Sequence, residues 1–177
     1  MVKLAPLQAE HVANFYNWLQ DPEVIQYSLT AFQVMKTPQQ IDQWFAATLQ
    51  QQNSLNLGIY LEETNALIGY AGLSGISTTN YSGEYFIFIG EKALWGKGVG
   101  TAVTKQILDI GFTSHQLNRI MLTVSESNTG GLKAYAKAGF VVEGRLRQAC
   151  YRLGLFHDKI VMSVLKTEWR QQGAAVG

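Results

Sequence analysis

Three glycines alternate with other residues in the segment Leu94-Trp95-Gly96-Lys97-Gly98-Val99-Gly100-Thr101. An apolar, strand-like run at 85–89 precedes this segment, and apolar residues recur at helical spacing over 99–110 after it. The first turn of a helix leaves backbone N–H groups unpaired, and with the helix dipole these groups bind phosphate. Glycine lets an anion approach such a loop closely. The segment 94–101 therefore predicts a site for a phosphate-bearing molecule.

The spacing of the glycines argues against two common phosphate-binding loops. A nucleotide-triphosphate P-loop needs Gly-Lys followed by Ser or Thr, but here Gly98 follows Lys97. A dinucleotide loop needs Gly-x-Gly-x-x-Gly at the first turn of a repeating β-α-β chain, whereas this loop lies in mid-chain. On the loop alone, a glycine-rich turn without a ligand, in a structural or interaction protein, remains an alternative.

A second motif lies downstream, in the segment 128–140. It holds Asn128, Tyr135 seven residues later, and then Gly139-Phe140. Together the two motifs resemble the GNAT superfamily of acetyl-CoA-dependent N-acetyltransferases, whose first motif is Arg/Gln-x-x-Gly-x-Gly/Ala. Trp95 departs from that pattern, because Arg or Gln is usual there. The end of the chain, from Phe140 to Met162, resembles the branch that holds ribosomal-protein N-terminal and spermidine acetyltransferases.

The elements needed to position these motifs can be read from hydrophobic periodicity. We expect strands at 2–7, 55–61, 67–73, 84–89, 120–124, 140–152 and 160–165, and helices at 12–19, 38–50, 99–114 and 128–138. The resemblance implies one α+β domain, with a mixed, mostly antiparallel sheet of about seven strands and helices on both faces. We place this single N-acetyltransferase domain at 1–170 and expect a frayed tail at 171–177.

The resemblance implies that the co-substrate is acetyl-CoA, which transfers its acetyl group directly to a primary amine in a ternary complex. Backbone amides of the loop would hold the pyrophosphate. Backbone groups of Phe88 and Ile89 would pair with the pantetheine arm and the thioester oxygen. The expected cofactor-binding residues are Phe88, Ile89, Trp95, Gly96, Lys97, Gly98, Val99, Gly100, Thr101 and Asn128.

Two residues are candidates for proton transfer. Tyr135 matches the general acid of the family, which would protonate the leaving thiolate. Its alternative role is that of a core aromatic, because Leu132 and Ala136 share its helical face. Glu84 is the candidate base for the attacking amine, since it lies on the strand that leads to the loop. Glu84 could equally be a surface residue, with a water chain carrying the proton.

The acceptor amine is harder to predict. A protein N-terminus, a polyamine and another small amine all remain open, and Tyr27, Arg145 and Tyr151 are candidates for lining the acceptor cleft. A polyamine site should gather several carboxylates, and Asp21 and Glu23 with the candidate base are few for that. A non-catalytic acyl-CoA-binding module is the alternative function, because the loop predicts binding without demanding chemistry.

The pantetheine arm of the co-substrate would need free backbone partners in the sheet. The strands 84–89 and 120–125 should run parallel and splay apart near Ile89 and Ser125. The arm carries amides that need backbone partners, and an open wedge leaves such partners free. The sequence therefore predicts a gap in the sheet beside the glycine loop.

Composition limits the expected partners, metal sites and cellular location. The chain has 177 residues and a net charge of +1 without basic or acidic blocks, so neither nucleic acid nor a membrane is an expected partner. Cys150 is the one cysteine, which excludes an internal disulfide and a cysteine-rich zinc site. His11, His115 and His157 share no metal-ligand spacing, and we expect no metal. We expect a cytoplasmic enzyme and allow for a homodimer.

Overall fold

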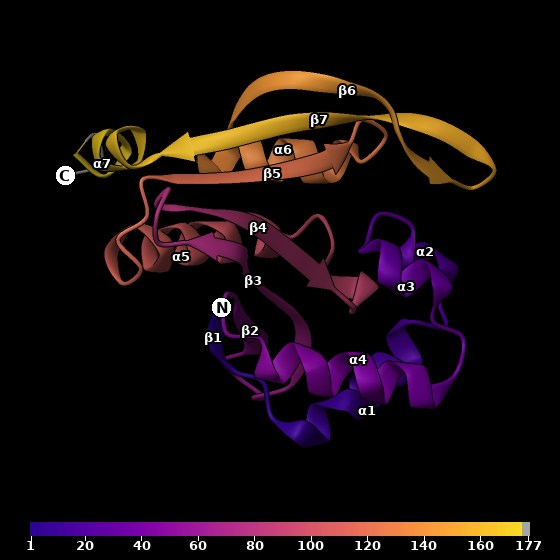
Figure 1. The fold of residues 1–177 in the computed structure, drawn as a ribbon. Coiled ribbons are helices and arrows are strands. Elements are labelled where there is room, and N and C mark those ends of the chain that lie inside the picture. Colours follow the sequence, from indigo (N-terminus) through magenta and orange to yellow (C-terminus); the bar gives the residue numbers. More distant parts are fainter. Residues whose placement is uncertain (175–177) are drawn as a thin grey trace.

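A seven-stranded mixed sheet forms the centre of the computed structural model, which describes residues 1–174 (Figure 1). The strands are β1 (Val2–Pro6), β2 (Leu55–Leu61), β3 (Leu67–Ser77), β4 (Ser82–Ile89), β5 (Arg119–Ser125), β6 (Val141–Arg152) and β7 (Leu155–Leu165). Their order in the sheet is β1-β2-β3-β4-β5-β7-β6. The β4–β5 pair is parallel, and the other neighbouring strands run antiparallel. The predicted fold class is confirmed.

Helices cover the sheet on both faces. They are α1 (Val12–Trp18), α2 (Pro22–Ile25), α3 (Thr30–Val34), α4 (Pro38–Gln50), α5 (Val99–Thr113), α6 (Thr129–Ala138) and α7 (Lys166–Ala174), with 3-10 turns η1 (Ala9–His11) and η2 (Lys92–Leu94). Side chains of β4 alternate between two cores. Tyr85 packs with residues of α5, whereas Phe88 packs in an aromatic cluster with residues of α1, α3 and α4. The sheet therefore separates a layer of α5 and α6 from a layer built by the N-terminal helices.

Helix starts follow the signals in the sequence. The Thr37 side chain accepts a hydrogen bond from the Gln40 amide at 3.3 Å, while the Gln40 side chain accepts one from the Thr37 amide at 3.1 Å. This reciprocal capping box, with Pro38 at the first helical position, begins α4 as expected. A second helix start lies at Asp21 and Pro22. The Asp21 carboxylate accepts from the Glu23 amide at 2.9 Å and so caps the short helix α2, which the periodicity did not reveal.

The C-terminal segments differ from expectation in two respects. Strand β7 begins directly after the turn at Gly154, so it is longer than the predicted 160–165. Helix α7 extends to Ala174, into the segment expected as a frayed tail, and residues 175–177 lie outside the described chain. Two contacts order this helix. The Leu165 amide donates to the Glu168 carboxylate at 2.8 Å, and the Trp169 ring lies 6.1 Å from that of Phe112.

Candidate functional site

A gap in the sheet opens between β4 and β5. The two strands pair at Ser82–Arg119, Gly83–Ile120 and Glu84–Met121, and they diverge beyond Glu84. Strand β4 stays paired with β3 as far as Ile89, and β5 stays paired with β7 as far as Ser125. One backbone edge of each strand therefore faces the gap without a partner strand, and Figure 1 shows the two strands separating. The prediction of parallel strands that splay is confirmed.

Two adjoining cavities occupy this region. The wedge cavity, of about 190 Å³, lies between β4 and β5, and Glu84, Ser125 and Lys159 are among its lining residues. The loop cavity, of about 440 Å³, lies between the glycine loop and the start of α6. Both cavities are lined by Phe88, Asn128 and Tyr135, together with residues of the α2–α3 connection. The arrangement forms one continuous site with a phosphate-binding end and a sheet-wedge end.

The glycine loop presents a row of free backbone donors. Gly98, with φ of 84°, precedes α5, and the first helical bond runs from the Ala102 amide to the Gly98 carbonyl at 3.0 Å. Within residues 1–174, the amides of 96–101 have no protein acceptor. A Cβ atom placed on Gly96 or Gly98 would meet no atom within 4 Å. The loop therefore leaves open space in front of its amides, which fits a pyrophosphate group.

Trp95 ties this loop to the end of β4. Its indole Nε1 donates a hydrogen bond to the Ile89 carbonyl oxygen at 3.1 Å, and its ring lines the loop cavity. The side chain that replaces the usual Arg or Gln of the motif therefore has a structural contact of its own. It fixes the point at which the chain leaves the sheet and enters the loop.

Asn128 caps α6, as its place in the motif indicates. Its side-chain oxygen accepts a hydrogen bond from the Gly131 amide at 2.9 Å. A Cβ atom on Gly131 would lie 2.7 Å from the Asn128 side-chain nitrogen, so this glycine gives the cap its room. Glycine at this position lowers helix propensity, but it permits the cap. The capped Asn128 side chain lines both cavities.

Tyr135 lies at the junction of the two cavities. Its ring contacts Tyr85 and Phe140 edge-on, with centroid distances of 6.0 and 6.1 Å. Burial raises the pKa of the Tyr135 phenol to about 12. The hydroxyl of the neighbouring Tyr85 already has a hydrogen-bond partner, the Thr104 hydroxyl, at 2.9 Å. Among the described residues the Tyr135 hydroxyl has no hydrogen-bond partner, so it is available to a bound molecule.

Glu84 stands at the inner end of the wedge. It is the last β4 residue paired with β5, its side chain is exposed, and it lines the wedge cavity together with Tyr135. The two residues predicted to transfer protons are therefore brought to one cavity.

Tyr27 connects the N-terminal helices to the site. It lies in the α2–α3 connection and lines both cavities. Its hydroxyl donates to the Ser127 carbonyl at 3.1 Å, although the two residues lie on opposite sides of the gap. The bond joins the N-terminal helices to the loop that follows β5.

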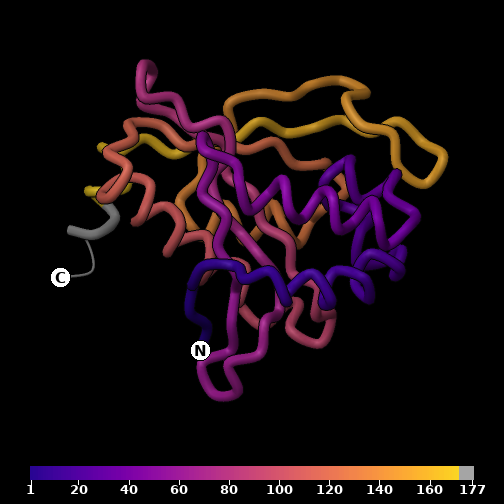
Figure 2. Tube along the Cα trace, turned by 60° about the horizontal axis from the view of Figure 1, so that its bottom comes forward, coloured from indigo at the N-terminus to yellow at the C-terminus, as the bar shows by residue number. Residues whose placement is uncertain are grey.

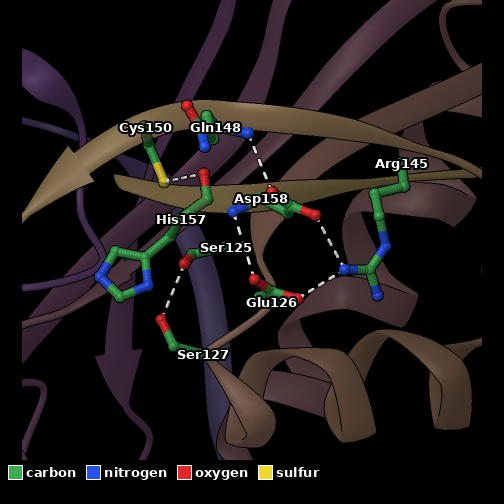
Figure 3. A network of polar contacts seen from close by, with 8 residues as sticks. All are labelled: Ser125, Glu126, Ser127, Arg145, Gln148, Cys150, His157 and Asp158. Atoms are coloured by element: carbon green, nitrogen blue, oxygen red, sulfur yellow. Dashed lines mark hydrogen bonds and ion pairs between the residues drawn. The ribbon is translucent and has the colours of Figure 1, made fainter. Parts of the chain in front are cut away.

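Arg145 and Tyr151, expected in the acceptor cleft, line neither cavity. Arg145 pairs with Glu126 at 2.7 Å and with Asp158 at 2.9 Å (Figure 3). Tyr151 is 56 % exposed and packs on Phe156 near the hairpin turn. Arg145 pairs with Ile160 in the β6–β7 ladder, and Tyr151 lies beyond a register shift between 146 and 150. A role for either residue in the acceptor cleft stays a prediction.

Arg152 and Lys159 were missed and do line the wedge cavity. Arg152 donates to the Ser28 carbonyl at 3.4 Å, a contact between residues far apart in the chain. Figure 2 shows the tip of the β6–β7 hairpin lying beside the N-terminal helices. The spacing of residues along the sequence cannot predict such a contact, because the contact depends on how the β6–β7 hairpin bends over the sheet.

Two further features of residues 1–174 concern metal ions and membranes. No His, Cys, Asp or Glu side chains there gather in a group of three that could hold a metal ion. No helix in the same part of the chain has the length and apolar character to cross a membrane.

Comparison with known proteins agrees with this geometry. Residues 2–141 match the model of the acetyltransferase (GNAT) domain. The uncharacterized N-acetyltransferase p20 of Bacillus licheniformis is 29% identical over 94% of this chain and 93% of its own. The putative ribosomal N-acetyltransferase YdaF of Bacillus subtilis is 28% identical over 66% of this chain and 62% of its own.

A solved structure shares the fold. The spermidine N-acetyltransferase of Vibrio cholerae, in complex with CoA and spermine, superposes with a TM-score of 0.85. The match has 21% identity and covers 96% of this chain and 98% of the other. The free loop amides, the splayed strands and the domain match lead to one conclusion: this chain belongs to the GNAT family and is an N-acetyltransferase that uses acetyl-CoA.

Proposed function

We propose that the loop cavity receives the pyrophosphate end of acetyl-CoA and that the wedge cavity receives its acyl end together with the acceptor amine. The gap between β4 and β5 is the observation that carries this proposal. A pantetheine arm can satisfy backbone groups on the edge of β4 that faces the gap beyond Glu84, while the amides of 96–101 face the phosphates. Both substrates would then meet beside Tyr135.

The proposed role of Tyr135 is to stabilise the leaving thiolate. A phenol with a pKa of about 12 stays protonated at neutral pH and can donate to the sulfur. A thiol has a pKa of about 8.5, so complete proton transfer from this phenol is unfavourable. Donation of a hydrogen bond to the developing charge is therefore the role that the environment favours, with solvent supplying the proton afterwards.

Glu84 is the proposed base. Its exposed carboxylate at the inner end of the wedge can take a proton through water from the ammonium form of the acceptor, which frees the nitrogen lone pair for attack. The neutral amine nitrogen then forms a bond to the acetyl carbon and the carbon–sulfur bond breaks. The nitrogen loses its second proton to solvent, and the CoA thiolate takes a proton from solvent.

The acceptor is a primary amine, and the named relatives suggest two kinds. YdaF is described as a ribosomal N-acetyltransferase, and the Vibrio cholerae enzyme was solved with spermine. We propose a cytoplasmic location, which the single cysteine supports. We further propose a homodimer, since residues 141–149 of the edge strand β6 are all exposed. Sedimentation at micromolar concentration tests the dimer.

The proposed function is tested by incubating the protein with acetyl-CoA and a panel of amines while free thiol is followed. Melting temperature with and without CoA reports binding separately. Turnover with at least one amine and a rise in melting temperature are expected. Tight CoA binding without turnover of any amine would favour a binding module instead.

A further inference from the structure

The charges around the wedge cavity differ from those a polyamine needs. Glu84 is the one carboxylate in its lining, and two cationic side chains, Arg152 and Lys159, face it. A neighbouring hairpin cavity of about 580 Å³ lies between helices α1–α4 and the β6–β7 turn. It shares Gln26 and Arg152 with the wedge cavity, and its other charged lining residue is Lys36. The approach to the wedge is therefore basic.

Carboxylates near the site are already paired. Lys92 holds Asp21 at 2.7 Å and Glu23 at 2.9 Å, and neither carboxylate lines the wedge cavity. On the β6–β7 side, Arg145 holds Glu126 and Asp158 in the same way. A trication placed in the wedge would therefore meet one unpaired carboxylate and two cations.

The two cations have capacity to bind an anion. Arg152 donates one bond to the Ser28 carbonyl and one to the Tyr151 carbonyl, at 3.4 and 2.8 Å, and its remaining N–H groups have no acceptor among residues 1–174. Lys159 has no ion-pair partner within residues 1–174. It lies opposite Ser125, whose strand forms the second wall of the wedge. A guanidinium and an ammonium that line the same cavity suit a carboxylate.

We propose that Arg152 and Lys159 form an anion subsite for the acceptor, so that the preferred acceptor is a primary amine that carries a nearby carboxylate. The inference rests on the proposed function, because it takes Tyr135 and Glu84 as the place where the amine reacts. The wedge cavity of about 190 Å³ keeps the two ends close, so amine and carboxylate are separated by only a few bonds. A free amino acid and the N-terminus of an acidic peptide share this chemistry.

Matched acceptors test the inference. β-Alanine is compared with β-alaninamide, the peptide Ser-Asp-Ala-amide with Ser-Asn-Ala-amide, and spermidine serves as the polycation. We expect kcat/KM for each acidic probe to exceed that of its neutral match by roughly 10-fold to 100-fold, the range of a charge-assisted hydrogen bond. Spermidine should be the poorest acceptor. The small-molecule and peptide pairs show which source of carboxylate the enzyme prefers.

Variants locate the effect. Arg152→Gln and Lys159→Gln should each reduce the preference for the acidic probe, whereas Arg170→Gln, at an exposed position of α7, should preserve it. Equal kcat/KM for acidic and neutral probes in the wild type would overturn the inference, as would equal behaviour of R152Q and R170Q. Using both wedge variants keeps the test valid if either one fails to fold.

A binding measurement separates this inference from the proposed function. CoA alone should raise the melting temperature, and succinate should raise it further in the wild type but not in R152Q. A response to CoA without a response to succinate sinks the anion subsite and leaves the proposed function intact. If CoA has no effect and no thiol is released, the proposed function fails, and succinate added without CoA still decides whether the subsite exists.

Discussion

The indole of Trp95 donates a hydrogen bond to the carbonyl oxygen of Ile89 at 3.1 Å, which joins the glycine loop to the last residue of β4. The contact spans the junction between the two ends of the site. It fixes the position of the loop amides relative to the edge of β4 that faces the gap. A motif position at which the family usually has a charged or amide side chain is thus used here to stiffen the backbone.

Trp95→Phe should weaken acetyl-CoA binding by roughly 2-fold to 10-fold, since one neutral hydrogen bond contributes about 0.5–1.5 kcal/mol. The KM for acetyl-CoA should rise while kcat changes little, because the loop is remote from the reacting atoms. Trp169→Phe, in the packing against Phe112, is the matched control. An unchanged dissociation constant for CoA in W95F would show that the indole bond does not organise the loop.

Gly98 should be irreplaceable for a reason beyond its backbone angle. Both Gly98 and Gly154 have positive φ, of 84° and 79°, and neither has an atom within 4 Å of an added Cβ. Alanine at either position should cost about 1–2 kcal/mol of stability from backbone strain. Only Gly98→Ala should also weaken CoA binding, as measured by calorimetry. Similar CoA affinities in G98A and G154A would argue against phosphate binding at this loop.

The sequence predicted the parts of the site that depend on local chemistry. Residue types within a short window predict the glycine loop, the motif that begins with Asn128, and the parallel strand pair. The gap between those strands was predicted from the backbone partners that a pantetheine arm needs. Short helices such as α2 escaped prediction because they are too brief to show a period. Alternation along β6 also gives no sign of the register shift between 146 and 150, which changes the residues that share one face of the strand.

Arg152 illustrates the remaining limit. Its contact with Ser28 arises because the β6–β7 hairpin bends over the N-terminal helices. Nothing near Arg152 in the sequence indicates that meeting, and the same holds for Lys159. Residues that set acceptor chemistry come together from distant segments, whereas those that hold the shared co-substrate lie in compact motifs.

Stability in acid should depend on Glu143. The Arg119 guanidinium, at 2.5 Å, and the Ser163 hydroxyl, at 2.6 Å, lower the pKa of the Glu143 carboxyl from 4.5 to about 2. A lowered pKa means that the carboxylate stabilises the fold above about pH 4.5, and this contribution is lost as pH falls towards 2. Glu143→Gln should therefore flatten the decline of melting temperature over that range. Glu62→Gln, at an exposed carboxylate on the opposite side of the sheet, should leave the decline unchanged.

Glu84→Gln should lower kcat at neutral pH and leave CoA affinity unchanged, because the carboxylate lines the wedge cavity but not the loop cavity. A positioned general base contributes about 100-fold or more to the rate. Raising the pH deprotonates more of the free amine, so the deficit of E84Q should shrink as pH increases. A deficit that is constant from pH 7 to pH 10 would point to a structural role for Glu84.

Tyr135→Phe provides the sharpest test of the chemistry, because Tyr85 offers an internal control. The Tyr85 hydroxyl is bonded to Thr104, whereas that of Tyr135 has no partner among the described residues and borders both cavities. Y135F should lower kcat by roughly 10-fold to 1,000-fold, as expected when a donor to a developing charge is lost, with little change in KM for acetyl-CoA. Y85F should instead lower the melting temperature, since it removes the buried hydrogen bond between the Tyr85 and Thr104 hydroxyls. With a pKa of about 12, Tyr135 stays protonated through pH 10, so its ionisation should not reduce the wild-type rate below that pH. A fall in kcat near pH 10 that disappears in Y135F would show that burial does not protect the phenol as the structure indicates.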